Sequence, residues 1–590
     1  MTVEYVAPRR DIRFALEQLV DLPALSKLPG FEHADPETVF GVLDEFGRFV
    51  EEVLAPIDHA GDTVGARFDP ATKAVTTAPG WAAAYRKYVD AGWGSVPFPA
   101  EHGGGGFPWL VAIAMQELLT AANMAWSLCP LLTQGAIDML MHHGSEEQQE
   151  RYLRPMVSGE WTGTMNLTEP EAGSDVGALR TRAVPSDDGD GSWRISGQKI
   201  FITYGEQDMT DNIVHLVLAR VPDAPPGTKG ISCFIVPKFL VHDDGTVGAR
   251  NRVECIGIEH KMGIHASPTC TLEYDGAIGY VIGEPNAGMR YMFTMMNVAR
   301  LSVGLSGLAV GESAYQQALA YATERRQGRA LGAAAGVSSP IVEHADVRRM
   351  LLTMRSTVEA MRGIVYANAE AIDLARHATD EPARVTAHER VDLLTPITKA
   401  WCTDMGTEIA SLAVQIHGGM GYIEETGIAQ RYRDIRIAAI YEGTNGIQAM
   451  DLVGRKVPMR GGAVVDDFIR EMESVDPDVG SAYPDAVAAL RRATALVLEH
   501  GASNSNDALG AASPYLRMFG LVVGGWVMAR QAIAARRLGL DDPYHEAKLV
   551  TARFYVEELL PQVHGLTAAV ESSSDVLLAL TPDQLRSTAS

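Results

Sequence analysis

The chain has 590 residues, of which 46% are hydrophobic and 21% charged, a balance typical of ordinary folded proteins. This length is too great for a single hydrophobic core and predicts three or four folding units. The formal net charge is −24, with no block of basic residues. We therefore do not expect nucleic acid as a partner, because binding to its phosphates needs clustered lysine and arginine.

The cysteines and the apolar segments indicate the cellular compartment in which the protein is expected. Five cysteines stand far apart in the sequence, without CxxC or mixed Cys/His ligand spacing. This pattern predicts reduced, mostly buried thiols and argues against a disulfide framework or a metal site. The first twenty residues lack an apolar core with a cleavage site, and their acidic residues argue against a transit peptide. The longest apolar run, 518–529, is shorter than the roughly 20 residues that span a bilayer. We therefore expect a cytoplasmic protein that is not an integral membrane protein.

The first part of the chain predicts a helical domain followed by a β domain. Up to about residue 160 the hydrophobic residues recur with a helical period, and Asp35 before Pro36 is a typical helix start. From Trp161 the pattern alternates and is rich in β-branched and aromatic residues, which is typical of short strands. Because no helices intervene, we expect an antiparallel barrel or sandwich and not a Rossmann sheet. Ser196-Gly197 is a predicted hairpin turn.

Helical periodicity returns after the strands and continues to the end of the chain. Three long segments and a shorter one after Thr444 predict a four-helix bundle. Small residues at 301–311 would let another backbone or a ligand come close. Residues beyond the glycine-containing linker 460–462 predict a further helical domain, used for packing or oligomerisation. The predicted class is α+β, with an N-terminal helical domain (1–160), a central antiparallel β-barrel or sandwich domain (161–285), a four-helix bundle (286–460) and an additional C-terminal helical domain (461–590).

Glu442 is the candidate catalytic carboxylate. It stands in the segment IYEGTNGIQ (440–448), where Gly443 and small polar residues end an apolar run and release the backbone from a helix. A carboxylate in apolar surroundings has its charged form disfavoured, and the raised pKa suits a general base. For a Glu-Gly pair on its own, an ordinary solvated glutamate at a helix end is the competing interpretation.

Five motifs, in this order, resemble those of the acyl-CoA dehydrogenase family. They are MNLTEPEAGSD (165–175), KIFITYG (199–205), ERR (324–326), QIHGGMGY (415–422) and IYEGTNGIQ (440–448). The length and the extra C-terminal domain resemble a long bacterial subgroup of the family, which includes broad-range fatty acyl-CoA dehydrogenases and 3-methylmercaptopropionyl-CoA dehydrogenases. The order and number of these motifs make the resemblance far more specific than any one of them.

The resemblance implies FAD as the cofactor, no metal, and a set of residues around each ligand. The residues expected at FAD are Met165, Leu167, Thr168, Gly173, Ser174, Phe201, Ile202, Thr203, Arg325, Gln415, Gly418, Gly419, Thr444 and Gly446. Those expected at the acyl-CoA substrate are Ser174, Asn297, Arg300, Tyr441 and Gly443. The sequence departs from the family pattern in three places: Phe201 stands where many relatives have tryptophan, Gly446 where many have glutamine, and Gln327-Gly328 where the family usually has Thr-Phe.

The resemblance also implies the reaction, which is α,β-dehydrogenation of a fatty acyl-CoA to the trans-2-enoyl-CoA, the first step of fatty acid β-oxidation. Glu442 would remove the α-proton while the β-hydrogen leaves as hydride to flavin N5. Some relatives carry the base just before the arginine corresponding to Arg300, but Ala299 cannot act as one. An electron-transfer flavoprotein is the expected electron acceptor. Flavin shared between subunits implies a homodimer, with a tetramer as the alternative.

Three other functions compete with this interpretation. An acyl-CoA oxidase, which passes its electrons to oxygen, has the same fold, and the motifs do not distinguish it. A nitroalkane-oxidase-like relative is expected to carry aspartate in place of Glu442. A non-catalytic, DNA-associated relative would need a basic C-terminal domain, which the charge of −24 argues against. The sequence does not specify the acyl group.

Overall fold

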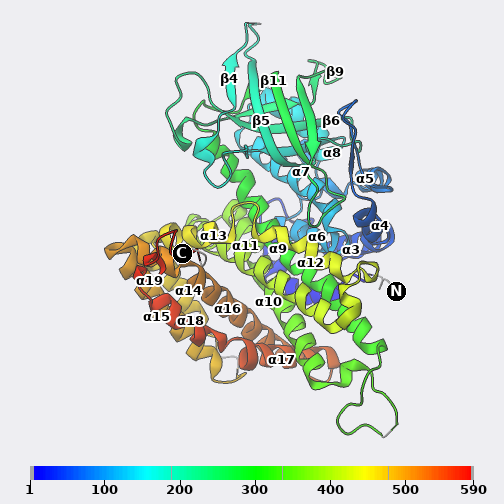
Figure 1. The fold of residues 1–590 in the computed structure, drawn as a ribbon, viewed down its shortest axis with the longest axis vertical. Helices are drawn as coiled ribbons and strands as arrows, with labels where there is room; N and C mark the ends of the chain where they lie inside the picture. Colours follow the sequence, from blue (N-terminus) through cyan, green and yellow to red (C-terminus); the bar gives the residue numbers. More distant parts are fainter. Residues whose placement is uncertain (1–4, 188, 335, 476–477, 587–590) are drawn as a thin grey trace. The chain divides into compact units, whose positions relative to one another are not determined.

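The computed structural model describes residues 5–187, 189–334, 336–475 and 478–586. The chain forms two compact units, and the helix α9 (Gly288–Glu324) begins in one and continues in the other (Figure 1). We call Gly30–Ser302 the β unit. We call Val303 onwards, together with Pro8–Pro29, the bundle unit.

The β unit begins with helices that carry clear start signals. The Asp35 side chain accepts hydrogen bonds from the amides of Glu37 and Thr38, so the predicted helix start there is confirmed. Ser145 forms a reciprocal capping box with Gln148 at the start of α8. The helices are α3 (Pro36–Phe49), which continues as a π-helical turn (Val50–Leu54), α4 (Ala55–Val64), α5 (Trp81–Asp90), α6 (Trp109–Ala122), α7 (Met124–His143) and α8 (Glu146–Ser158).

One seven-stranded sheet dominates the β unit. Its order is β3-β6-β7-β11-β5-β4, and β10 pairs with β11. The strands are β3 (Trp161–Asn166), β4 (Arg182–Pro185), β5 (Trp193–Thr203), β6 (Asn212–Ala219), β7 (Ser232–Pro237), β10 (Val253–Ile258) and β11 (Thr269–Val281). Two small ribbons join β1 (Arg67–Phe68) to β2 (Val75–Thr76) and β8 (Phe239–Val241) to β9 (Val247–Arg250).

The sheet agrees with the α+β prediction but corrects two details. It is mixed, because β3 runs parallel to β6 while the other pairs are antiparallel. The predicted hairpin at Ser196-Gly197 is wrong, since β5 continues straight through it. Gly197 instead lets Thr181 come close: a Cβ there would lie 2.5 Å from the Thr181 hydroxyl oxygen. The glycine therefore marks a close approach between segments and not a turn.

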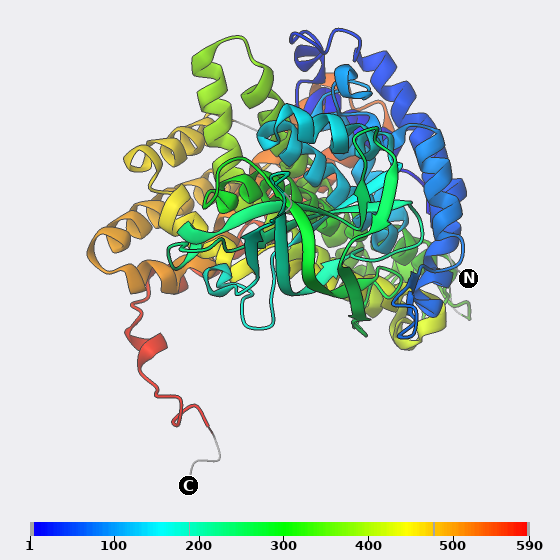
Figure 2. The same cartoon turned by 90° about the horizontal axis from the view of Figure 1, so that it is seen from above.

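The bundle unit is built on long, closely packed helices. Its elements after α9 are α10 (Ala345–His377), α11 (Glu381–His417), α12 (Ile428–Ile435), α13 (Asn445–Asp451), α14 (Ala463–Glu473), α15 (Ala482–Ser503), α16 (Ser505–Leu538), α17 (Pro543–Phe554), α18 (Gln562–Glu571) and α19 (Asp575–Leu578). Helices α10 and α11 pack side by side, and α16 packs against both. Figure 2 shows the chain after α18 running away from these helices.

The small residues of 301–311 serve the packing of α9 on α11. A Cβ added at Gly304 would lie 2.6 Å from the carbonyl oxygen of Thr398, and one at Gly307 would lie 2.0 Å from that of Cys402. Of the two possibilities left open by the sequence, another backbone and a ligand, the structure shows the backbone. Both glycines are needed because any side chain would push the helices apart.

The first helix of the chain packs with the last part of the bundle unit. Helix α1 (Arg9–Gln18) contacts α10, and its Asp11 carboxylate accepts a 2.7 Å hydrogen bond from the Tyr544 hydroxyl. Lys548 bridges Asp11 and Glu359 at 2.7 and 3.1 Å. Burial opposes ionisation of Asp11, but the charges of Lys548 and Arg362 outweigh it and lower its pKa. The ionised cluster therefore fixes α1 on the bundle unit.

Among the described residues, α9 and α16 are long and apolar enough to cross a membrane by length and composition. In the most apolar window of each, 83% and 89% of the residues are buried inside the protein. This is the environment of core helices, and it confirms the expectation that 518–529 is a buried helix.

Candidate active site

Glu442 lies in a strained turn between two helical segments of the bundle unit. A short 3₁₀ segment (Arg436–Ala439) precedes it, and α13 begins at Asn445 with Thr444 as its cap, whose hydroxyl accepts from the Ile447 amide. Glu442 has φ +57° and Gly443 has φ +84°. A left-handed conformation costs a non-glycine residue about 1–2 kcal/mol, and such strain concentrates at functional sites. The break predicted from the sequence is thus present, with the half-buried carboxylate at its apex.

Asn445 ties this turn to α11. Its Oδ1 accepts a 2.8 Å hydrogen bond from Nζ of Lys399, which is completely buried. Its Nδ2 donates to the Thr403 hydroxyl at 3.0 Å and to the Asp404 carboxylate at 2.7 Å. Burial raises the pKa of Asp404, although the bond from Asn445 opposes the rise. One amide side chain therefore positions the turn against three side chains of a rigid helix.

Gln448 and Tyr441 complete the surroundings of Glu442. Gln448 Nε2 donates to the carbonyl oxygens of Glu442 and Gly443 at 3.3 and 3.5 Å. Within the described part of the chain, its Oε1 atom and the Tyr441 hydroxyl are buried without a hydrogen-bond partner. Burial, and next the Glu442 charge, raise the pKa of Tyr441, so its hydroxyl stays protonated. Buried polar atoms without partners are uncommon, and they mark positions where a ligand can complete the site.

The two segments expected at the flavin lie side by side in the β unit. The Ile200 amide donates a 2.9 Å hydrogen bond to the Thr168 carbonyl, which joins Met165–Thr168 to the end of β5. Phe201 follows with φ +60° and a ring that is 58% exposed. An exposed, strained aromatic residue gains nothing from the protein's own core, so its ring is available to pack on a ligand. Ile202 and Thr203 continue the same strand and pair with β11.

A buried ion pair joins the same two segments. Lys199 Nζ donates to the Leu167 carbonyl at 2.9 Å and to Glu169 at 2.8 Å, and Lys199 is fully buried. Glu169 also accepts from the Thr181 amide and hydroxyl. Burial lowers the pKa of Lys199 to about 8, against the opposing effect of Glu169. For Glu169, burial opposes ionisation but is outweighed by Lys199 and the hydrogen bonds, so its pKa is lowered. The pair is ionised at neutral pH.

The other residues predicted in the β unit are spread along its surface. Gly173 and Ser174 lie exposed in the loop after β3, where nothing lies within 4 Å of a Cβ built on Gly173. On α9, Asn297 is exposed, whereas Arg300 is buried with its guanidinium 5.8 Å from the Phe293 ring centroid. Of these four positions, Asn297, Gly173 and Ser174 are therefore open to a ligand.

The remaining predicted residues of the bundle unit lie away from the Glu442 turn. Gln415, Gly418 and Gly419 are exposed at the C-terminal end of α11, and Gly418 has φ +59°. Gln415 is 16 residues beyond Lys399 on one continuous helix, which is about 24 Å at 1.5 Å per residue. Arg325 is exposed just after α9. The glycine turn and the catalytic turn of one chain therefore serve distant parts of a ligand or different ligands.

The sequence did not assign roles to Lys199, Glu169, Lys399, Asn445 or Gln448. Four of them lie in the quoted motifs, and Lys399 lies in the middle of α11. The partners of Lys199, Glu169, Lys399 and Asn445 come from other segments of the chain, whereas Gln448 bonds to the carbonyls of Glu442 and Gly443. A signal was available for the two lysines, because each stands in a segment that the periodicity predicts as buried, where an ammonium needs a partner.

Comparison with known proteins places the chain in a family. Models of the acyl-CoA dehydrogenase N-terminal, middle and C-terminal domains match residues 41–160, 164–277 and 286–457, and an acetyl-CoA dehydrogenase C-terminal-like model matches 464–581. The chain belongs to the acyl-CoA dehydrogenase family, whose members are FAD-dependent oxidoreductases.

Relatives of similar length support this assignment over the whole chain. A 3-methylmercaptopropionyl-CoA dehydrogenase from Ruegeria pomeroyi is 44% identical, over 97% of this chain and 99% of that protein. A butyryl-CoA dehydrogenase from Syntrophomonas wolfei is 37% identical, over 96% and 97%. The solved structure of Caenorhabditis elegans ACDH-11 in complex with C11-CoA has the same fold, with a TM-score of 0.77, 16% identity, and coverage of 99% of this chain and 97% of that chain.

Proposed function

We propose that the chain dehydrogenates an acyl-CoA between its α and β carbons, with Glu442 as the base that removes the α-proton. The observation that carries this proposal is the strained turn at Glu442, which Asn445 holds against α11 and whose carbonyls accept hydrogen bonds from Gln448. A solvated glutamate at a helix end would need neither the positive φ nor this support. The geometry therefore favours the catalytic interpretation over the ordinary one.

The residues present fit an FAD cofactor. Phe201 offers an exposed ring, and the adjoining Met165–Thr168 segment is fixed to the same strand by Lys199. At the end of α11, Gly418 and Gly419 have open space where a side chain would stand. Backbone without side chains allows amides to face an anion such as a diphosphate. The exposed guanidinium of Arg325 suits the same group because its fork donates bidentately.

Each residue near Glu442 has a separate task in this mechanism. The strained turn presents the half-buried carboxylate at its apex. Tyr441 stays protonated and packs beside the carboxylate, where its unpartnered hydroxyl can meet the substrate. Bound FAD would supply the acceptor for the β-hydrogen. A well-placed base contributes a factor of roughly 10² to 10⁴ to such a proton abstraction.

We infer the finer assignments from the same resemblance. The long relatives, one acting on a 3-methylmercaptopropionyl-CoA and another on butyryl-CoA according to their names, support a short acyl chain. An electron-transfer flavoprotein would be the electron acceptor, and the protein would be cytoplasmic. The Asn445 anchor covers Lys399 to Asp404, and Gln415 lies 11–16 residues further along α11, which is about 16–24 Å at 1.5 Å per residue. This separation supports a homodimer in which each chain contributes to two flavin sites.

The test is anaerobic mixing of the purified, FAD-bound protein with acyl-CoAs of graded length and with 3-methylmercaptopropionyl-CoA. Flavin bleaching is expected in the wild type, and Glu442→Gln should slow it by a factor of about 10² to 10⁴ or more while retaining FAD. Glu425→Gln is the matched control, because Glu425 is exposed in the same unit. Undiminished bleaching in Glu442→Gln would refute the assignment of the base.

A further inference from the structure

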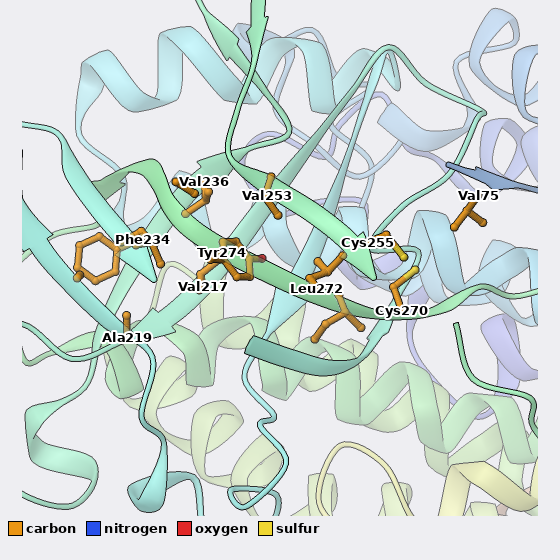
Figure 3. Close-up of a cluster of buried hydrophobic side chains, with 14 residues drawn as sticks. Val75, Val217, Ala219, Phe234, Val236, Val253, Cys255, Cys270, Leu272 and Tyr274 are labelled. Carbon is orange, nitrogen blue, oxygen red and sulfur yellow. The ribbon is translucent and has the colours of Figure 1, made fainter. Parts of the chain in front are cut away.

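Two cysteine side chains meet in the core of the β unit. Cys255 and Cys270 belong to the cluster of buried side chains drawn in Figure 3, where their sulfur atoms point toward one another. They are 1% and 0% exposed. The Cys255 thiol donates to the Gly257 carbonyl at 3.3 Å and the Cys270 thiol to the Glu206 carbonyl at 3.9 Å, and the two thiols also interact with one another. The proposed dehydrogenation uses neither residue.

The strand register explains why these two thiols meet. Cys255 lies on β10 opposite Leu272, and Cys270 lies two positions away on the same partner strand, opposite Ile258. A bulge interrupts the ladder between Cys255 and Gly257. A bulge adds local twist and redirects side chains. It thereby brings a diagonal pair, normally about 7–8 Å apart at the Cα atoms, within thiol contact.

The two thiols differ in acidity. The hydrogen bond from Cys270 lowers the pKa of Cys255. Burial, and then the neighbouring Cys255, raise the pKa of Cys270. The pair thus contains one thiol whose pKa is lowered and one whose pKa is raised. This asymmetry is typical of a reactive cysteine beside a resolving cysteine.

Cys255 is buried, so a small reagent reaches it only when β10 opens locally. β10 pairs along one side with β11 and ends the ladder there, and its residues Glu254, Gly257 and Ile258 are not fully buried. Edge strands open locally at a lower free-energy cost than central ones. Opening of β10 would expose Cys255 while Cys270 stays in the central strand.

We propose that Cys255 and Cys270 form an oxidisable dithiol, which hydrogen peroxide converts to an intramolecular disulfide. The Cys255 thiolate attacks one peroxide oxygen, forms a sulfenic acid and releases hydroxide, which takes up a proton to become water. Cys270 sulfur then attacks the sulfenic sulfur, forms the S–S bond and releases a second water. Two thiols lose two electrons and two protons, and one peroxide is reduced to two waters.

The disulfide would act on the candidate flavin strand, and this consequence rests on the function proposed above. Cys270 is the register partner of Ile202 on β5. A Cβ added at Gly205, the last residue of KIFITYG, would lie 3.2 Å from Cys270 Cβ. Closing the S–S bond to about 2.05 Å pulls β11 toward β10, away from this packing. We therefore expect oxidation to weaken FAD binding.

The experiment treats the purified FAD-bound protein with a small excess of hydrogen peroxide, and then counts thiols by alkylation after denaturation. Of the five cysteines, two should become unreactive, recover with dithiothreitol, and appear as one peptide pair joining Cys255 to Cys270. Cys270→Ser should form no disulfide, and Cys129, Cys233 and Cys402 serve as internal controls. Five reactive thiols, or oxidation of Cys255 beyond sulfenic acid without a disulfide, would overturn the proposal. The wild-type measurement decides this even if a variant fails to fold.

The FAD dissociation constant, measured before and after oxidation, tests the link to the flavin strand. The expected rise is about threefold or more, a size typical of coupling between neighbouring residues, with no rise in Cys270→Ser. A disulfide that leaves FAD binding unchanged would refute the link. Failure of the protein to bind FAD would refute the proposed function, while the thiol count would still decide the dithiol.

Discussion

The ammonium group of Lys399 donates a 2.8 Å hydrogen bond to the side chain of Asn445, three residues after the candidate base Glu442. The same amide donates to Asp404 at 2.7 Å. The position of the Glu442 turn therefore depends on buried polar contacts with the middle of α11 as well as on the turn's own sequence.

We expect Asn445→Ala to reduce the rate of flavin bleaching by about 10²-fold, because a displacement of about 1 Å at a catalytic group has that effect. Asn445→Asp should be worse, since its carboxylate would face that of Asp404. The measurement is single-turnover kinetics on FAD-bound protein. Asn506→Ala, at an exposed position of α16, should be unaffected. A wild-type rate in Asn445→Ala would show that the turn keeps its position without the hydrogen bonds of the Asn445 side chain.

The Lys199–Glu169 pair should support flavin binding through the two segments that it joins. Lys199→Met leaves a buried carboxylate without its cation, at a cost of about 3–5 kcal/mol, and should reduce the FAD content. The double variant Lys199→Met with Glu169→Gln should recover most of the melting temperature but not full FAD affinity. Melting curves and FAD absorbance measure the two effects.

A matched control for this prediction is the buried pair Lys238–Glu206 in the same unit, which Arg250 supports at 3.1 Å. Lys238→Met should destabilise the protein by a similar amount while the folded fraction keeps its FAD. Equal loss of FAD in both lysine variants would show that Lys199 affects flavin binding through general stability alone.

Because Phe201 has a strained backbone, substitutions there should affect the stability of the FAD-free protein and its affinity for FAD differently. At φ +60°, glycine avoids a Cβ clash worth about 1–2 kcal/mol. We expect the FAD-free Phe201→Gly protein to be more stable than Phe201→Ala by about 1 kcal/mol, while both bind FAD more weakly than the wild type. Urea unfolding and FAD titration provide the measurements. If Phe201→Ala proved the more stable of the two, the strained conformation would be absent in solution.

Buried His215 should make the free energy of unfolding depend on pH. Burial, then the charges of Lys238 and Arg250, lower its pKa from 6.5 to about 3. Between these values the unfolded chain binds a proton that the folded chain does not. The free energy of unfolding therefore falls as the pH falls below 6.5, by up to about 1.4 kcal/mol per pH unit from this group.

The measurement is urea unfolding at pH 7.5 and 5.5. From this group, the wild type should lose about 1 kcal/mol more than His215→Gln between the two pH values, because the variant cannot take up a proton. Identical pH dependence in both proteins would mean that His215 is protonated in the folded state as readily as in the unfolded one.

The sequence predicted the order of domains and the break at Glu442, because hydrophobic period and glycine placement are local signals. It could not predict the positive φ of Glu442 or of Phe201, since no single residue type there demands it and distant contacts impose it. The parallel pairing of β3 with β6 was missed for the same reason: it joins strands with two others between them in sequence. The roles of Lys199 and Lys399 follow from their hydrogen-bond partners, which only the structure identifies.

The contact between the first and seventeenth helices has a consequence for how the protein is made. The Tyr544 hydroxyl and the Asp11 carboxylate are 533 residues apart in sequence. At about 5–20 residues per second, the ribosome needs roughly half a minute to two minutes to cover that distance. Helix α1 leaves the ribosome long before Tyr544 and must wait for this partner. The bundle unit therefore completes its fold only after α17 has been made, and anything that captures α1 in that interval delays it.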